Sequence, residues 1–293
     1  MRAFSGLHPA VQLFCFLSVL SVAVFSSDPV LSMTALLGGM LFSFTLRKKS
    51  EVLGDLGFYI PLFFLVAVTN PLFSHNGVTP LFFLNGNPVT LEAVVCGAAL
   101  AVTVISVMLW CKCFGEVMTS DRLLFLSGSV APRLGLVLSA ALRFIPVFFR
   151  QMKRVGSAQK TMGLYSERGA VDRLRSRGRI FLAMLSWSLE RSMETASSMR
   201  ARGYGSGRRT SFSLFRFTPH DAALLVVTAA LLGITVAGMA TGAAAFTFYP
   251  QISMPGVTPL SVATHIAFGI LSLLPFALEV WEAILWKYYA SRI

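Results

Sequence analysis

Residues that could support catalysis or hold a metal are scattered along this chain. Four histidines lie near the boundaries of apolar segments without the spacing of metal ligands: His8, His75, His220 and His265. Four cysteines lie in or beside apolar runs and form no Cys-x-x-Cys pair: Cys15, Cys96, Cys111 and Cys113. We interpret the cysteines as small buried apolar residues. The sequence therefore predicts no metal site and no bound cofactor.

Acidic side chains are equally sparse within the apolar segments. Ionisable groups in lipid are costly and usually mark a function, so an intramembrane enzyme would cluster them at one depth. Glu92 and Asp221 instead lie at segment ends, and Glu279 and Glu282 fit an interfacial position. The chain also lacks the G-x-x-x-x-G-K-[ST] phosphate loop. We therefore expect a protein that is not an enzyme and does not hydrolyse ATP by itself.

The most definite chemistry lies in the tripeptide Ala201-Arg202-Gly203. Glycine suits the left-handed residue that closes a helix, and a cation suits the negative end of the helix dipole. The arginine offers five donors in a planar fork, which fits carboxylates or carbonyls of a partner. A plain helix cap explains the tripeptide equally well. The choice between a partner contact and a plain helix cap depends on the helices that carry the tripeptide.

The composition places those elements in a membrane. Hydrophobic residues make up 55% of the chain, the mean hydropathy is +0.70 and only 13% of residues are charged, whereas a soluble domain carries about 25% charged residues. Runs of about 20 apolar residues predict six spans, at 10–27, 29–46, 56–73, 91–111, 221–240 and 262–286. The expected fold class is an all-α integral membrane protein with long cytoplasmic amphipathic coupling helices.

The positions of the cations test this topology. With the N-terminus inside, all 25 Lys and Arg residues fall on the inner side, because the presumed outer loops around 26–29, 74–90 and 241–259 contain none. Lys and Arg collect on the cytoplasmic side of membrane proteins. We therefore expect a multi-pass cell-membrane protein with both termini in the cytoplasm. Its regions would be 1–111 with four spans, 112–219 as a basic cytoplasmic region, and 220–293 with two spans.

The basic region 112–219 holds 19 Lys and Arg residues against six acids. On a helical wheel, five of these cations share an arc of about 120° opposite an apolar face: Arg143, Arg150, Lys153, Arg154 and Lys160. Such a helix lies near the membrane interface with its cations toward lipid headgroups, although a solvated basic face is the alternative. A second helix, predicted from about residue 179 to 202, is apolar in its first half.

The segment 134–149 is apolar enough to suggest a seventh span. It is only 16 residues long and contains Arg143 and Pro146. A crossing there would also place the later arginines outside, against the distribution rule for cations. We therefore predict that this segment does not cross the membrane.

With these elements, the chain resembles the transmembrane T component of energy-coupling factor (ECF) transporters, which import vitamins and metals. The resemblance rests on motifs in family order up to about residue 205: Leu7-His8-Pro9, Asn70-Pro71-Leu72-Phe73, Leu142-Arg143-Phe144-Ile145-Pro146 and Met199-Arg200-Ala201-Arg202-Gly203-Tyr204. It implies a non-catalytic coupling subunit of an ABC transporter complex in a prokaryotic cell membrane. The implied partners are two ABC-type ATPase subunits, a substrate-binding membrane subunit and membrane lipids.

The family carries two Ala-Arg-Gly tripeptides at the ends of its coupling helices, and each arginine docks into a groove on one ATPase subunit. The second tripeptide matches Ala201, Arg202 and Gly203, whereas the first is replaced by Thr161, Met162 and Gly163. A methionine can fill an apolar pocket by shape but cannot donate a hydrogen bond. The resemblance therefore implies two unequal ATPase contacts, one charge-assisted and one hydrophobic.

A self-contained channel or secondary carrier is the alternative function. Carriers often contain internal repeats and broken helices near the bilayer midplane, and no convincing repeat relates the first and last spans here. A nucleic-acid binder would rest on the basic region alone, which has no stacking platform or recognised motif. We expect no nucleic-acid partner. The transported substrate stays open, because in the resembled family another subunit binds it.

Overall fold

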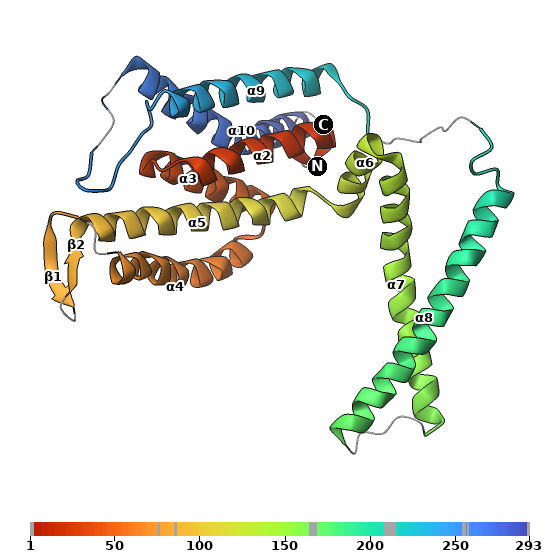
Figure 1. The fold of residues 1–293 in the computed structure, drawn as a ribbon. Coiled ribbons are helices and arrows are strands. Elements are labelled where there is room, and N and C mark those ends of the chain that lie inside the picture. The colour runs from red at the N-terminus through yellow and green to blue at the C-terminus, as the bar shows by residue number, and fades with distance from the viewer. Residues whose placement is uncertain are drawn as a thin grey trace. The chain divides into compact units, whose positions relative to one another are not determined.

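The computed structural model describes residues 3–74, 77–84, 87–163, 169–207, 215–253, 256 and 258–291. His75 and parts of the basic region, 164–168 and 208–214, lie outside them. The elements are α1 (Ala3–Gly6), α2 (Pro9–Phe25), α3 (Pro29–Leu46), α4 (Lys49–Phe73), β1 (Pro80–Leu84), β2 (Asn87–Thr90), α5 (Leu91–Val117), α6 (Ser120–Val130), α7 (Pro132–Thr161), α8 (Ala170–Ala201), α9 (Pro219–Ala240) and α10 (Pro259–Ala290) (Figure 1). The predicted all-α membrane fold is confirmed, with one short antiparallel hairpin, β1–β2, in the described residues.

The chain divides into two compact units. Unit 1 comprises Met1–Arg122 and Phe215–Ile293, and unit 2 comprises Leu123–Leu214. The six predicted spans correspond to α2, α3, α4, α5, α9 and α10, all in unit 1. Four of these helices begin with a proline in their first turn after a side-chain cap. Proline suits this position because its missing N–H would have no intrahelical partner there.

The set of helices that could cross a membrane differs from the prediction. By length and composition, six described helices qualify: α3, α4, α5, α7, α9 and α10. Helix α2 has 17 residues, at the lower end of the usual span length of about 17–25 residues. The length argument against a span at 134–149 was wrong, because the helix continues through Pro146 and reaches 30 residues. The distribution of Lys and Arg still predicts that α7 does not cross the membrane.

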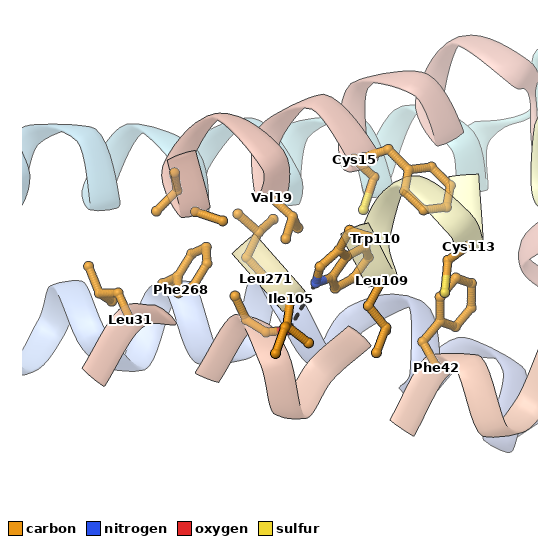
Figure 2. Packing of buried hydrophobic residues seen from close by; sticks show 14 of the residues in the cluster. Cys15, Val19, Leu31, Phe42, Ile105, Leu109, Trp110, Cys113, Phe268 and Leu271 are labelled. Atoms are coloured by element: carbon orange, nitrogen blue, oxygen red, sulfur yellow. Dashed lines mark hydrogen bonds between the residues drawn. The ribbon is translucent and has the colours of Figure 1, made fainter. Parts of the chain in front are cut away.

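The core of unit 1 is built around Trp110 on α5, whose side chain is fully buried. Its indole Nε1 donates to the Ala35 carbonyl at 2.9 Å, so the one polar atom of the ring is satisfied. The ring stacks on Phe42 at 6.1 Å and meets Phe16 edge to face at 5.9 Å, as Figure 2 shows for Phe42. Aromatic contacts of this kind fix α2, α3 and α5 against one another.

Close packing of α4 on α5 depends on Gly97. A Cβ atom there would lie closer to the Ala67 carbonyl oxygen than van der Waals contact allows, and 3.1 Å from the Cβ of Asn70. The Asn70 amide also donates to the Ala93 carbonyl at 3.1 Å. The Asn-Pro motif of α4 thus lies against α5 where only glycine fits, a packing device common between membrane helices.

We predict opposite effects of alanine at two glycines of α5. Gly97→Ala should lower the stability of the purified protein by about 1–3 kcal/mol, the usual cost of overpacking. Gly115→Ala is the matched control, because its Cβ would enter open space and should raise stability by roughly 0.5–1 kcal/mol through helix propensity. Thermal unfolding in detergent measures both. Equal effects of the two variants would contradict the described packing of α4 on α5.

An ion-pair cluster joins one set of helix ends in unit 1. Arg47 donates to Asp55 at 3.0 Å and to Glu116 at 2.7 Å, and Lys112 also pairs with Asp55. Burial lowers the pKa of the Arg47 guanidinium, but the hydrogen bond and charge of Glu116 and the charge of Asp55 outweigh it and hold the pKa above its ordinary value. The cluster places the end of α3, the start of α4 and the end of α5 together.

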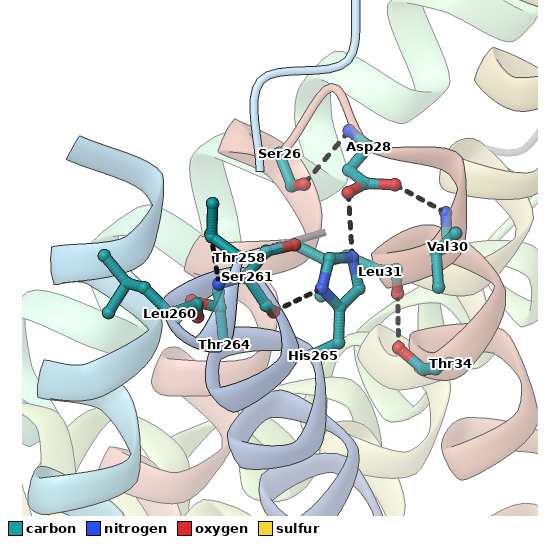
Figure 3. Close-up of polar contacts among 10 residues, drawn as sticks. All are labelled: Ser26, Asp28, Val30, Leu31, Thr34, Thr258, Leu260, Ser261, Thr264 and His265. Carbon is teal, nitrogen blue, oxygen red and sulfur yellow. Dashed lines mark hydrogen bonds and ion pairs between the residues drawn. The ribbon is translucent and has the colours of Figure 1, made fainter. Parts of the chain in front are cut away.

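A second polar cluster joins the starts of α3 and α10 (Figure 3). The buried Asp28 carboxylate caps α3 by accepting from the Val30 N–H at 2.9 Å and lies 2.9 Å from Nε2 of His265. The other ring nitrogen, Nδ1, lies 2.7 Å from the Ser261 carbonyl oxygen. The imidazole ring of His265 thus joins its own helix, α10, to the residue that caps α3.

Candidate coupling surface

Helices α7 and α8 form an antiparallel pair within unit 2. The rings of Phe144 and Trp187 stack at 5.5 Å with an angle of 24° between their planes. Twelve residues further along α7, a Cβ on Gly156 would lie 3.7 Å from the Ile180 side chain. Met184, between these contacts, is 1% exposed. The helices cross along this stretch and diverge beyond it, so the end of α8 stands away from α7 (Figure 1).

The C-terminus of α8 has the geometry of a Schellman cap. Gly203 adopts φ +83°, its N–H donates to the Arg200 carbonyl at 2.9 Å, and the Tyr204 N–H donates to the Met199 carbonyl at 3.0 Å. These are the two backbone bonds that define the motif. The predicted end of the helix at Ala201-Arg202-Gly203 is confirmed, although α8 begins at Ala170, nine residues earlier than predicted. The exposed Arg202 side chain is not needed for these backbone bonds.

The C-terminus of α7 repeats part of this geometry without the arginine. Thr161 is the last helical residue, Met162 is the cap, and Gly163 follows with φ +67°. The Gly163 N–H donates to the Lys160 carbonyl at 3.1 Å. Met162 is 71% exposed. The two helix ends therefore share a cap with left-handed glycine, and they differ in the side chain that the cap presents to solvent.

The two caps lie at opposite ends of the helix pair. From the contact between Gly156 and Ile180, α8 runs about 33 Å to Arg202, and α7 runs about 9 Å the other way to Met162, at 1.5 Å per residue. The two cap side chains are thus roughly 40 Å apart. At this separation the two cap side chains cannot enter one binding groove.

All five residues of the predicted basic stripe are exposed along α7. Arg143 lines a groove of about 680 Å³ with Arg191 and Arg202, where the two helices diverge. Arg150 and Arg154 line a different hollow of about 230 Å³ on α7. Sequence reasoning missed the grouping of Arg143 with Arg202, because it depends on how α7 packs against α8. Contact of the other stripe residues, including Lys153, with lipid headgroups stays a prediction.

A long apolar stripe covers the face of α8 that points away from α7. Its residues recur at helical spacing, and each is at least 47% exposed: Val171, Leu174, Phe181, Leu182, Leu185, Leu189 and Met193. Exposed apolar patches of this extent mark a contact with a protein or a membrane. The sequence predicted an apolar first half of this helix, and the structure extends the stripe by a further turn to Met193.

The described part of the chain contains no cluster of metal-binding side chains. No three side chains of His, Cys, Asp or Glu are placed there so that they could hold one ion.

The fold and these surfaces define a multi-pass α-helical membrane protein with a separate pair of long amphipathic helices. The family model of CbiQ, described as a cobalt transport protein, matches residues 2–214. The chain therefore belongs to this family of membrane transport proteins. The match includes both helix caps and all four motifs on which the resemblance to T components rests.

Similar curated proteins carry the name energy-coupling factor transporter transmembrane protein EcfT. The chain is 34% identical over 103 residues to that of Listeria innocua, 32% over 111 residues to that of Thermotoga maritima, and 29% over 103 residues to that of Lactobacillus helveticus. These regions cover 34%, 37% and 34% of this chain, and 39%, 41% and 37% of the relatives. The chain thus matches about two fifths of their length. The predicted likeness to T components is confirmed.

Proposed function

We propose that this chain is the transmembrane coupling subunit of an ECF-type ABC importer for a vitamin or a metal ion. ATPase subunits would hydrolyse ATP, and the chain would transmit their motion to a substrate-binding membrane subunit. The observation that carries this proposal is the pair of helix caps at Met162 and Arg202, which share a glycine geometry and lie roughly 40 Å apart. Two ATPase subunits side by side would each receive one cap.

The two ATPase contacts would differ in strength. Arg202 can make charge-assisted hydrogen bonds to carboxylates or carbonyls of a groove, and such bonds are about twice as strong as neutral ones. Met162 would only bury apolar surface. The small Ala201 beside the arginine permits close approach of the partner backbone.

The apolar stripe on α8 would hold the substrate-binding membrane subunit. It lies on the face opposite α7, so a partner there would leave both caps accessible. When the ATPase pair closes, its pull on the caps would move the stripe, and with it the substrate-binding subunit. Residues 112–219, which include unit 2, would then be the cytoplasmic coupling region, with both chain termini also in the cytoplasm.

Purification from the native membrane in mild detergent tests the proposed assembly. Mass spectrometry of proteins that co-purify with the tagged chain should identify two ABC-type ATPase subunits, or two copies of one, and a small apolar membrane protein. Recovery of the chain alone, while a known membrane complex from the same extract stays intact, would overturn the proposal and favour the channel or carrier.

The cap of α7 allows a test by gain of function. Met162→Arg should increase the affinity for the ATPase subunits roughly tenfold or more, because a hydrogen bond to a charged group contributes about 1.5–3 kcal/mol. The converse variant, Arg202→Met, should weaken it by a similar factor. Titration of purified ATPase against the chain in nanodiscs measures both. No gain from Met162→Arg would indicate that the groove facing α7 has no acceptors for an arginine.

A further inference from the structure

The chain leaves unit 1 after Arg122, and a polar contact fixes it at that point. One guanidinium nitrogen of Arg122, Nη1, donates to the Gln12 side-chain oxygen at 2.9 Å and to the Val117 carbonyl at 2.7 Å. Gln12 is fully buried on α2. Its amide nitrogen donates to the carbonyls of Phe4 at 2.6 Å and Leu7 at 3.0 Å. We call the segment around Arg122, where the chain passes from unit 1 into unit 2, the first connector. These hydrogen bonds tie it to the start of α2.

The chain returns to unit 1 at Phe215, and a second polar contact fixes it within a few residues. Asp221, 2% exposed, accepts from the Thr218 N–H at 2.8 Å and the Thr218 hydroxyl at 2.7 Å. Its other carboxylate oxygen accepts from the His8 N–H at 2.9 Å. The Phe217 ring meets the His8 ring edge to face at 5.3 Å. The second connector is thus tied to the residue that caps α2.

Both connectors of unit 2 therefore end on one turn of α2, between His8 and Gln12. The contacts join residues 110 and 213 positions apart in the sequence. A buried glutamine and a buried carboxylate in an apolar unit are costly unless every polar atom is paired. Helix capping alone would need neither Gln12 nor the bond from Asp221 to His8.

We propose that the first turn of α2 is a shared anchor through which unit 2 passes force to the membrane helices, with Arg122, Gln12 and Asp221 as positioning residues for coupling. This inference rests on the proposed function. Motion of unit 2 would pull on α2 through both connectors at once. Without the anchor, the connectors would absorb the motion and the membrane helices would not follow it.

Hydrogen exchange of the purified chain tests the shared anchor without any partner. Arg122→Ala should speed amide exchange at least fivefold in residues 118–131, and also across the anchor in residues 216–224. Asp221→Asn, which is isosteric, should likewise speed exchange in residues 216–224 and, across the anchor, in residues 118–131. Arg133→Ala, an exposed arginine at the start of α7, is the control and should change neither segment. Exchange that rises only in the connector carrying each substitution, or in neither, would overturn the anchor.

Coupling is measured with the complex reconstituted in proteoliposomes. For Arg122→Ala and Asp221→Asn, substrate taken up per ATP hydrolysed should fall at least fivefold while ATPase binding stays within twofold of wild type. Arg122→Lys, which keeps the charge, should recover part of the loss. An unchanged ratio would overturn the role in coupling. If the wild-type chain bound no ATPase, the proposed function would fail, but the exchange experiment would still decide whether the anchor exists.

Discussion

Replacing Arg202 by glutamate should reduce substrate uptake at least tenfold and remove most of the ATPase from the purified complex. If Arg202 makes the proposed contact, the variant loses charge-assisted hydrogen bonds worth about 1.5–3 kcal/mol each and places an anion against the acceptors of the ATPase groove. The helix should persist, because its cap consists of backbone bonds of Gly203 and Tyr204. An acid at the C-terminus costs only about 0.3–1 kcal/mol through the helix dipole.

Two controls separate a lost contact from a lost fold. Arg133→Glu makes the same charge change at an exposed site of unit 2 and should keep uptake within twofold of wild type. Circular dichroism of the Arg202→Glu protein should match that of wild type. Full ATPase recovery and normal uptake with the variant would mean that Arg202 acts as an ordinary helix cap.

Removal of the Asp28 side chain should destabilise the membrane unit by about 1–3 kcal/mol for the hydrogen-bond partner left unsatisfied and by about 1 kcal/mol more for the lost cap of α3. Asp28→Ala leaves His265 without its carboxylate and α3 without its capping oxygen. The pair ties α3 to α10 across 237 positions of sequence, so thermal unfolding in detergent should begin at a much lower temperature.

A variant that removes only a helix cap separates the effect of the lost cap from that of the lost contact between Asp28 and His265. Thr258→Ala removes the side chain that caps α10 through a 3.2 Å bond from the Ser261 N–H and should cost about 1 kcal/mol. The double variant Asp28→Ala with His265→Ala should be less destabilised than the sum of the two single variants. Strict additivity would contradict the interaction of these two side chains.

Much of the fold could be predicted from local patterns. Apolar runs of about 20 residues located the long helices of unit 1, because a span of that length is visible directly in the sequence. The end of α8 was predicted to the residue, since glycine after a cation is a specific cap signal. The Thr-Met-Gly departure at the end of α7 was likewise visible, and the structure adds that Gly163 keeps its left-handed conformation.

Other features depend on contacts that no local pattern encodes. Arg143 lines a groove with Arg202 because α7 packs against α8, a tertiary contact that includes the stacked rings of Phe144 and Trp187. The apolar segment 134–149 and the basic stripe that ends at Lys160 were treated as separate features, whereas one helix, α7, contains both and continues through Pro146. Gln12 gave no signal at all, since a single polar residue in an apolar helix does not reveal its partner.

We propose that this chain transports nothing by itself and couples ATP hydrolysis to uptake by a partner. Proteoliposomes containing the chain alone, the chain with its substrate-binding subunit, and the full complex with ATPases test this directly. We predict that substrate accumulates only in the full complex with ATP and that vanadate, an inhibitor of ABC-type ATPases, stops it. Accumulation driven by the chain alone, without ATPases, would overturn the proposed coupling role and identify a self-contained carrier.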